Sequence, residues 1–268
     1  MTEPVDLLLS GRRAVVTGAG RGIGLAVADT LAAEGVDVVL VARDQGALDK
    51  AAQRVARHGR RVLALTADTT DDTAVRAMAA RAIGELGGID ILVNCAAQPA
   101  TGASTALADL RDEDLRVEVE TKVLGYLRCA RALAPDMKAR GWGRIINVSG
   151  LAARQTGSPF GSIRNVAVAA MTKNLADELG PHGINVTVVH PGMTVTERTP
   201  GLLAERAEAL GVTAEEAEAR IVAGISIGRI VTAEEIADVV TFLASPRSVA
   251  VTGDAVSVGG GARGPIHY

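Results

Sequence analysis

Near the start of the chain, three glycines have a spacing that suits ligand binding by the backbone: Gly18-x-x-x-Gly22-x-Gly24. They stand between a short apolar run, 14–17, and a segment whose apolar residues repeat at helical spacing, 23–34. Glycine permits a tight turn and a close approach of the backbone to a ligand, and a helix N-terminus offers free N–H groups to an anion. The spacing in this context predicts a loop that binds the diphosphate of a dinucleotide.

The end of the second predicted strand bears on which dinucleotide binds. The chain there reads Arg43-Asp44. Arg43 can pair with a 2′-phosphate through charge-assisted hydrogen bonds, and Arg21 in the glycine loop can add to that charge. An acid at the strand end would instead bond a ribose 2′-hydroxyl, so Asp44, one place further on, leaves NAD open. The residues favour NADP.

A second place suited to chemistry is His190, which precedes Pro191-Gly192 at the carboxyl end of a predicted strand. Ligands of open α/β sheets bind at such ends, and the ordinary pKa of histidine suits acid–base work. The alternative is a packed, hydrogen-bonded histidine with a structural role.

Strand-like and helix-like segments alternate along the chain, which predicts an α/β fold with a doubly wound parallel sheet of Rossmann type. The predicted strands are 14–17, 36–41, 62–66, 89–94, 144–148, 184–189 and 255–258. The predicted helices are 23–34, 45–58, 73–85, 113–140, 160–179, 205–223 and 233–244, with a polar loop over 194–201. Without an internal repeat or low-complexity linker, we expect one domain over residues 1–268.

Composition excludes several classes of partner. Hydrophobic residues make up 48% of the chain and aromatic residues 2%, so the core consists of Ala, Val, Leu and Ile. The net charge of −3, without a run of like charge, argues against nucleic acid and anionic membranes as partners, and the apolar runs are too short to span a bilayer. Cys95 and Cys129 form neither a disulfide framework nor a metal-binding pattern, which predicts a reduced, cytoplasmic compartment and no metal.

Several motifs, taken in order, resemble those of the short-chain dehydrogenase/reductase family along nearly the whole chain. They are the glycine loop, Asp68-Thr69, Asn94-Cys95-Ala96-Ala97, Pro191-Gly192 with Thr194 and Thr196, and the tail from Val251-Thr252-Gly253 to Val258-Gly259-Gly260. The resemblance implies cofactor contacts from Gly18, Gly20, Arg21, Gly22, Ile23, Gly24, Arg43, Asp68, Thr69, Asn94, Ala96, Pro191, Gly192, Thr194 and Thr196.

The resemblance also implies a Rossmann-type subunit in a homotetramer or homodimer, with a mobile lid near residues 194–223 over a small-molecule substrate. Hydride transfer in the family needs no metal. A tyrosine exchanges the proton, a lysine lowers the pKa of that tyrosine, a serine holds the substrate oxygen, and an asparagine on the long helix keeps a water in line with the lysine.

The four positions that carry this chemistry in the family are all altered in this chain. By motif offset, the asparagine, serine, tyrosine and lysine positions fall on Lys122, Gly150, Ile163 and Ala167. Shifting the alignment does not restore the phenol, because the chain's two tyrosines are Tyr126 and Tyr268. A general acid must therefore come from elsewhere or be absent.

Four side chains are candidates to replace the missing groups: Lys122, Ser149, Ser162 and His190. Lys122 points toward the site by homologous placement, and a desolvated lysine can titrate near neutrality. Ser149 precedes the family's serine position and Ser162 flanks the tyrosine position. Arg164, on the other side of that position, can recognise an anionic group of a substrate. A purely structural role is the alternative for each.

Three functions remain open on the sequence. The first is an NADP-dependent oxidoreductase, acting on a carbonyl or alcohol, whose proton path is rebuilt around Lys122 or His190. The second is an NADP-binding protein without turnover, as a regulator or partner subunit, because all four positions are lost together. The third is a non-redox lyase or isomerase that uses the same site.

Overall fold

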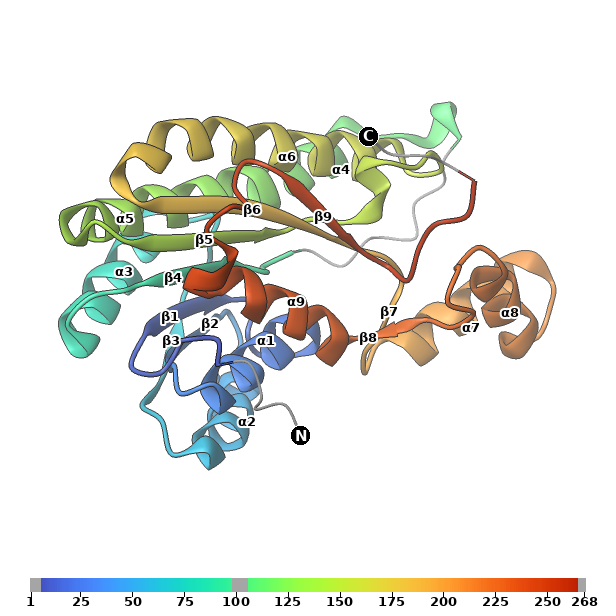
Figure 1. The fold of residues 1–268 in the computed structure, drawn as a ribbon. Coiled ribbons are helices and arrows are strands. Elements are labelled where there is room, and N and C mark those ends of the chain that lie inside the picture. Colours follow the sequence, from blue (N-terminus) through green and yellow to red (C-terminus); the bar gives the residue numbers. More distant parts are fainter. Residues whose placement is uncertain (1–5, 98–105, 265–268) are drawn as a thin grey trace.

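A seven-stranded parallel sheet forms the centre of the protein (Figure 1). The computed structural model describes residues 6–97 and 106–264. Along the sheet the order is β3-β2-β1-β4-β5-β6-β9. The strands are β1 (Arg13–Thr17), β2 (Asp37–Ala42), β3 (Val62–Thr66), β4 (Ile91–Asn94), β5 (Gly143–Val148), β6 (Ile184–Pro191) and β9 (Ala255–Val258). The order reverses between β1 and β4, so the carboxyl ends of these strands border the crevice where ligands bind in such sheets. The predicted doubly wound parallel sheet is confirmed.

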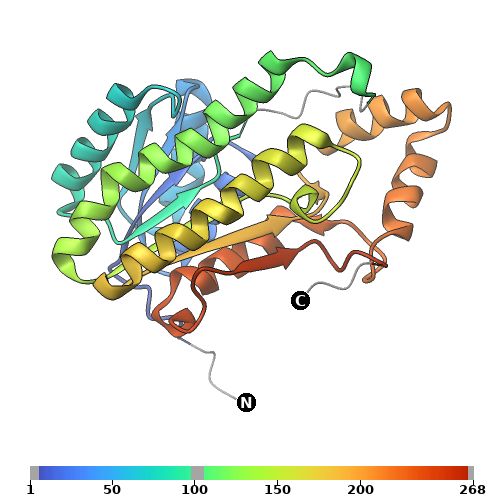
Figure 2. The ribbon, with the colours of Figure 1, turned by 90° about the horizontal axis from the view of Figure 1, so that it is seen from above.

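Helices cover both faces of the sheet. Helices α1 (Gly22–Ala33), α2 (Gln45–Val55) and α9 (Ala233–Ala244) lie on one face, and α3 (Asp72–Leu86), α5 (Gly125–Arg140) and α6 (Pro159–Leu179) lie on the other (Figures 1 and 2). Each face has its own core: Leu31 and Ile236 pack in the first, Met78 and Leu133 in the second. Fully burying such a side chain contributes about 1.5–3 kcal/mol. The continuous apolar runs of the strands follow from burial on both faces.

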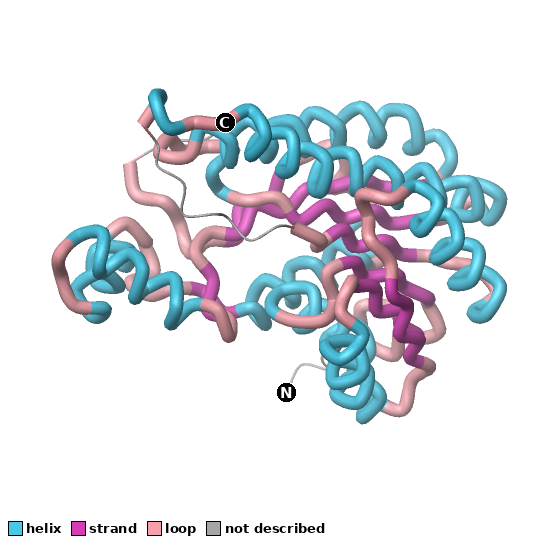
Figure 3. Tube along the Cα trace, turned by 180° about the vertical axis from the view of Figure 1, so that it is seen from behind, coloured by secondary structure: helices cyan, strands magenta, loops and turns pink. Residues whose placement is uncertain are grey.

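The segment after β6 differs from the prediction. We expected a polar loop over 194–201 and one helix over 205–223, and the structure instead has a short strand and two helices. Strand β7 (Thr194–Val195) pairs with β8 (Val231–Thr232), and the helices are α7 (Thr199–Leu210) and α8 (Ala214–Ala223). Gly211 ends α7 with a φ of +63°, and Thr213 begins α8 with a capping box. The helices project from the carboxyl edge of the sheet (Figures 1 and 3).

The long helix predicted over 113–140 is interrupted by a wider turn. Helix α4 (Asp112–Glu118) continues into α5 through a π-helical segment, Val119–Leu124. A π-turn holds an extra residue, which changes the direction in which the following side chains point. Two polar residues of this segment, Thr121 and Lys122, are buried.

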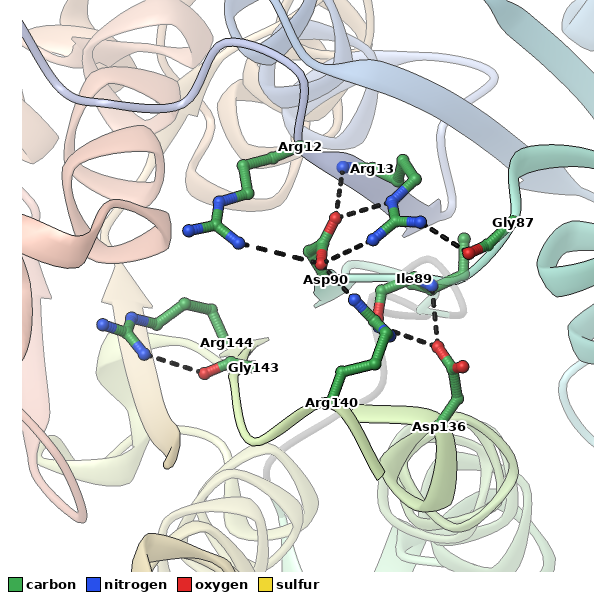
Figure 4. Close-up of polar contacts among 9 residues, drawn as sticks. All are labelled: Arg12, Arg13, Gly87, Ile89, Asp90, Asp136, Arg140, Gly143 and Arg144. Atoms are coloured by element: carbon green, nitrogen blue, oxygen red, sulfur yellow. Dashed lines mark hydrogen bonds and ion pairs between the residues drawn. The ribbon is translucent and has the colours of Figure 1, made fainter. Parts of the chain in front are cut away.

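Charged residues gather at the amino edge of the sheet (Figure 4). This edge is opposite to the carboxyl ends of the strands. Asp90, which precedes β4, accepts hydrogen bonds from the Arg13 backbone N–H at 3.0 Å and from its guanidinium at 2.8 and 3.0 Å. Arg140 also donates to Asp90, and Arg12 lies 3.9 Å from it. Burial alone would raise the pKa of Asp90, but the hydrogen bonds from Arg13 and Arg140 hold it below its ordinary value. We call these four residues the Asp90 cluster.

Trp142 extends this charged edge. The guanidinium carbon of Arg12 lies 3.9 Å from the centre of the Trp142 ring, and that of Arg144 lies 4.6 Å from it. Arg144 is buried and donates to the carbonyls of Gly143 and Ser245, the latter at the end of α9. Burial lowers the pKa of Arg144 to about 10, and the charge of Arg12 acts in the same direction. The aromatic face and the carboxyl end of a helix both favour a cation here.

Candidate active site

The glycine loop between β1 and α1 packs too tightly for side chains at two positions. A Cβ atom at Gly18, where φ is +67°, would lie 2.9 Å from the Ala96 nitrogen and from the Cys95 carbonyl carbon. A Cβ atom at Gly24 would lie 2.4 Å from the Gly18 carbonyl oxygen. The loop therefore lies directly against the chain that leaves β4, and α1 begins close to its own strand.

The first turn of α1 has no side-chain cap among the described residues. The N-cap residue, Arg21, makes no side-chain hydrogen bond to the first turn, so the N–H groups of that turn stay available. The segment after β6 reaches the same place, because a Cβ atom at Gly22 would lie 3.6 Å from Cγ2 of Thr196. Two parts of the predicted cofactor site, about 170 residues apart in the chain, are thus brought together.

The ends of β2 and β3 lie side by side. Arg43 has 57% of its side chain exposed, and its Nη1 lies 3.9 Å from a carboxyl oxygen of Asp68. Burial would raise the pKa of Asp68, but hydrogen bonds from Thr70 and the charge of Arg43 lower it. Asp44 accepts a hydrogen bond from the Ala47 N–H at 2.9 Å and caps α2. Arg43 is therefore exposed at the strand end while Asp44 is bound to its own helix.

The residues that follow β4 are held by hydrogen bonds to their neighbours. The N–H groups of Cys95 and Ala96 both donate to Oγ1 of Thr17, at 3.1 and 3.2 Å. The Asn94 side chain donates to Oδ1 of Asn147 at 2.9 Å, joining β4 to β5 in a fully buried position. Asn94 thus fixes the strand ends, and its backbone leads into the chain beside the glycine loop.

The segment after β6 is also closely bound. The Gly192 N–H donates to the Val258 carbonyl at 3.2 Å, and Oγ1 of Thr194 donates to the Gly192 carbonyl at 3.0 Å. Thr199, which was not among the predicted site residues, donates to the Thr194 carbonyl at 3.0 Å. These bonds hold Pro191, Gly192 and Thr194 in one turn beside β9.

Lys122 lies inside the protein at the carboxyl edge of the sheet. Only 5% of the residue is exposed, and Nζ donates to the Ser149 carbonyl, just past the end of β5, at 2.8 Å. Within the part of the chain that the structure describes, no carboxylate forms an ion pair with it. Burial lowers the pKa of Lys122 to about 7, and the charge of Arg164 adds to this. The amine can therefore gain and lose a proton near neutrality.

The positions of the family's serine, tyrosine and lysine hold groups that exchange no proton. Ile163 is 50% exposed and Ala167 is half-buried, on one side of α6. A Cβ atom at Gly150 would lie 3.0 Å from Nδ2 of Asn165, which itself donates to the Gly150 carbonyl at 3.3 Å. The glycine thus leaves room for a side chain from α6.

Hydroxyl groups near these positions are already bonded to the backbone. Ser149 donates to the Asn165 carbonyl at 3.3 Å and Ser162 to the Gln155 carbonyl at 3.1 Å. Tyr126 is buried, and its phenol donates to the Val148 carbonyl at 2.8 Å. Burial raises the pKa of Tyr126 well above its ordinary value. Tyr268 lies outside the described residues. Among the described residues, none of these hydroxyls matches the basicity of the Lys122 amine.

His190 on β6 is also buried, and its Nδ1 has no hydrogen-bond partner among the described residues. Burial lowers the pKa of His190 to about 4, with the charges of Arg154 and Lys122 acting in the same direction. The imidazole is therefore neutral at pH 7. Of the two predicted proton carriers, Lys122 has the pKa closer to neutrality.

Sequence reasoning missed an ion pair beside Lys122. Nη1 of Arg164 on α6 lies 2.9 Å from Oε2 of Glu118 at the end of α4, and both side chains are nearly buried. Glu118 stands four residues before Lys122, but nothing in the spacing shows that Arg164 reaches it. The carboxyl edge of the sheet thus carries both the glycine loop after β1 and the buried Lys122 amine, which is bonded just past the end of β5.

Comparisons with known proteins agree with this class. The chain matches the short chain dehydrogenase family over residues 12–207. It is 38% identical over 267 residues to the short-chain reductase protein NovJ of Streptomyces niveus, covering 97% of this chain and 99% of that protein. It is 31% identical to the 3-oxoacyl-[acyl-carrier-protein] reductase FabG of Escherichia coli K12, covering 94% and 97%.

A solved structure is similar over the whole fold. L-sorbose reductase from Gluconobacter frateurii, complexed with NADPH and L-sorbose, has a TM-score of 0.90 at 31% identity and covers 98% of this chain and 100% of its own. The chain therefore belongs to the short-chain dehydrogenase/reductase family, as its motifs indicated. In the described residues, no helix is long and apolar enough to cross a membrane.

Proposed function

We propose that the protein is an NADP-dependent oxidoreductase that interconverts a carbonyl group and an alcohol, with the Lys122 amine exchanging the proton. The observation that carries this proposal is the place of that amine. It is buried at the carboxyl edge of the sheet, bonded to the Ser149 carbonyl at 2.8 Å, and has a pKa of about 7. Relatives whose names describe ketoacyl reduction and L-sorbose reduction support a carbonyl substrate.

The residues present fit a dinucleotide. A Cβ atom at Gly18 or Gly24 would clash with neighbouring backbone, so the tight loop needs glycine at both positions. The start of α1, which has no side-chain cap, offers N–H groups to a diphosphate. Arg43 is largely exposed, with one long contact to Asp68, and could pair with a 2′-phosphate, whereas Asp44 caps α2. This supports NADP over NAD. When bound, the cofactor would supply or accept the hydride.

Lys122 would complete the reaction at the substrate oxygen. In the reducing direction an N–H bond of the ammonium breaks, an O–H bond forms on the former carbonyl oxygen, and solvent later returns a proton to the amine. A pKa near the working pH leaves both forms of the amine populated, which is what a proton carrier needs. The Ser149 carbonyl holds the amine in one place between steps.

We propose that α7 and α8 act as a lid over the substrate, because they project from the edge of the sheet where the site lies (Figure 3). We also propose a homotetramer or homodimer, as the family resemblance implies. Cys95 and Cys129 are both free thiols, and burial raises the pKa of each to about 12, which fits a cytoplasmic protein.

The test is NADPH oxidation with a panel of carbonyl compounds. We expect Lys122→Met to lower kcat/KM by about 10²–10⁴-fold, the usual contribution of a general acid, while NADPH binds as before. Lys138→Met, at an exposed lysine of α5, is the matched control and leaves turnover unchanged. Full turnover in Lys122→Met contradicts the proposal.

One further outcome distinguishes a second candidate function, a catalytically silent NADP-binding protein. Ile163 and Ala167, which exchange no proton, favour this candidate. Tight binding of NADPH without turnover on any carbonyl compound would support it and overturn the first. Absence of binding to any pyridine nucleotide would overturn both.

A further inference from the structure

An ion pair joins α4 and α6 in the neighbourhood of Lys122: the Ser149 carbonyl accepts from Lys122, and the Ser149 hydroxyl donates to the carbonyl of Asn165, the residue after Arg164. Arg164 follows Ile163 on α6, and its Nη1 lies 2.9 Å from Oε2 of Glu118 at the end of α4. The two side chains are only 14% and 15% exposed, so the geometry of the pair is fixed by packing rather than by solvent. The π-helical turn that follows Glu118 carries Lys122 into the interior.

The pair is more than a surface contact, because it fixes a cation near a buried amine. Lys122 has one hydrogen bond, to the Ser149 carbonyl, and no carboxylate pairs with it among the described residues. Glu118 instead pairs with Arg164. A second cation near an amine in a poorly solvated place disfavours the charged form of that amine.

We propose that Arg164, held in place by Glu118, is a positioning residue that keeps the Lys122 amine able to release and retake a proton. This inference rests on the role proposed for Lys122 in the reaction. Glu118 holds the guanidinium in place, and its own charge favours the ammonium form of Lys122 less than the charge of Arg164 disfavours it.

Other groups face the amine from the surrounding elements. Cys95, after β4, and Glu118 favour its protonated form, whereas Arg164 opposes it. His190 on β6 is neutral at pH 7, with a pKa of about 4, and the Cys95 thiol has its pKa raised to about 12 by burial, so neither changes charge as Lys122 titrates. Tyr126, on α5, donates to the Val148 carbonyl and stays protonated. Replacing Arg164 therefore tests how a neighbouring positive charge affects the protonation of Lys122.

The experiment measures the proton affinity of Lys122 directly, without turnover. The full-length protein is pulse-labelled with acetic anhydride, a small neutral reagent that acylates neutral amines, from about pH 5 to about pH 10, and the peptide with Lys122 is quantified by mass spectrometry. We expect a midpoint near pH 7 in the wild type. Arg164→Gln moves that midpoint up by about one pH unit, and Arg164→Lys, which keeps the cation, leaves it close to wild type.

Two further variants serve as controls for charge removal and for folding. Arg128→Gln removes a similar pair, since Arg128 lies 2.5 Å from Glu120 on the same helical run, and it leaves the midpoint unchanged. Glu118→Gln with Arg164→Gln removes both charges, so no buried charge is left alone if the single variant fails to fold. This double variant also raises the midpoint, because the effect of Arg164 on Lys122 exceeds that of Glu118.

The outcomes separate this inference from the proposed function. An unchanged midpoint in Arg164→Gln and in the double variant overturns the inference, whatever the enzyme turns over. A shifted midpoint together with full turnover in Lys122→Met supports the inference for the amine and overturns its use in the reaction. If the midpoint shifts in Arg164→Gln and Lys122→Met loses turnover, both the inference and the proposed function are supported. The pH profile of kcat/KM in Arg164→Gln then shifts together with the labelling midpoint.

Discussion

The two edges of the sheet differ in whether a buried ionisable side chain has partners of opposite charge. At the amino edge, Asp90 is surrounded by Arg12, Arg13 and Arg140, and its pKa stays low despite burial because Arg13 and Arg140 donate to it (Figure 4). At the carboxyl edge, the Lys122 amine donates to a carbonyl and has no carboxylate partner among the described residues, and burial lowers its pKa to about 7.

The difference shows which charges hold the fold and which serve a reaction. A buried charge with full partners keeps its ionisation state, and removing a partner destabilises the protein. A buried charge without a counter-ion is costly to the fold and easily changes its protonation state, which is the property of groups at functional sites. Within the described part of the chain Arg144 also pairs with no carboxylate, but Trp142 and the end of α9 stabilise its charge, and its pKa of about 10 stays far from neutrality.

The largest effect that would test this contrast is expected at the amino edge. Asp90→Asn removes the carboxylate that Arg13 and Arg140 share, although Arg140 keeps its ion pair with Asp136 at 2.7 Å. We expect the free energy of unfolding to fall by about 3 kcal/mol. Urea unfolding at neutral pH measures it. NADPH affinity and turnover of the folded fraction stay at wild-type values, because Asp90 lies at the other end of the strands. If the folded variant has wild-type stability, or if it loses cofactor binding, Asp90 does not act on the fold alone. The proposed difference between the two edges is then contradicted.

Much of the sheet could be predicted from the sequence, because its signals are local. Strand β2 overlaps the predicted strand 36–41, in which residues 38–41 are all apolar, and the start of α1 is marked by the glycine spacing. The break at Gly211 was missed because the residues on both sides repeat with helical spacing. A glycine alone does not show that the chain turns there.

The decisive features of the site depend on contacts between distant parts of the chain. Nothing in the composition of Val119–Leu124 marks a π-turn, and that turn is what buries Lys122. Arg164 reaches Glu118 across 46 positions of sequence and Arg13 reaches Asp90 across 77, so both pairs follow from the packing of whole elements. The sequence could name Lys122 and His190 as candidates, but their burial and pKa values come from the fold.

The second effect concerns stability as a function of pH at the carboxyl edge. The unfolded chain keeps a proton on Lys122 up to its ordinary pKa of 10.5, whereas the folded protein releases it near pH 7. Between these values the unfolded state binds more protons, so the stability of the wild type rises with pH. Relative to Lys122→Met, we expect a gain of about 1 kcal/mol per pH unit between about pH 7 and about pH 9, from urea unfolding.

Lys138→Met serves as the control for this measurement, because Lys138 is exposed and its variant follows the wild-type pH dependence. If the curves of the wild type and Lys122→Met run parallel, the folded and unfolded states bind the same number of protons at Lys122. In that case folding does not change the protonation of the amine. The carboxyl edge then holds no lysine whose charge is lost on burial, and the proposed contrast with the amino edge is wrong.

The smallest effect is expected at Arg43. We propose that its charge binds a ligand and does not stabilise the fold, so replacing it tests the contrast with the Asp90 cluster. Its guanidinium is 57% exposed and lies 3.9 Å from Asp68, and such an exposed pair contributes little to stability. Arg43→Gln should therefore leave urea unfolding unchanged and lower the preference for NADPH over NADH about tenfold, which is about 1.4 kcal/mol of a charge-assisted bond to the 2′-phosphate. Binding titrations with both nucleotides measure it, and Arg57→Gln, at an exposed arginine just beyond α2, is the control. A preference unchanged by Arg43→Gln would mean that the carboxyl edge selects its nucleotide by other groups, with Arg21 in the glycine loop as the next to replace.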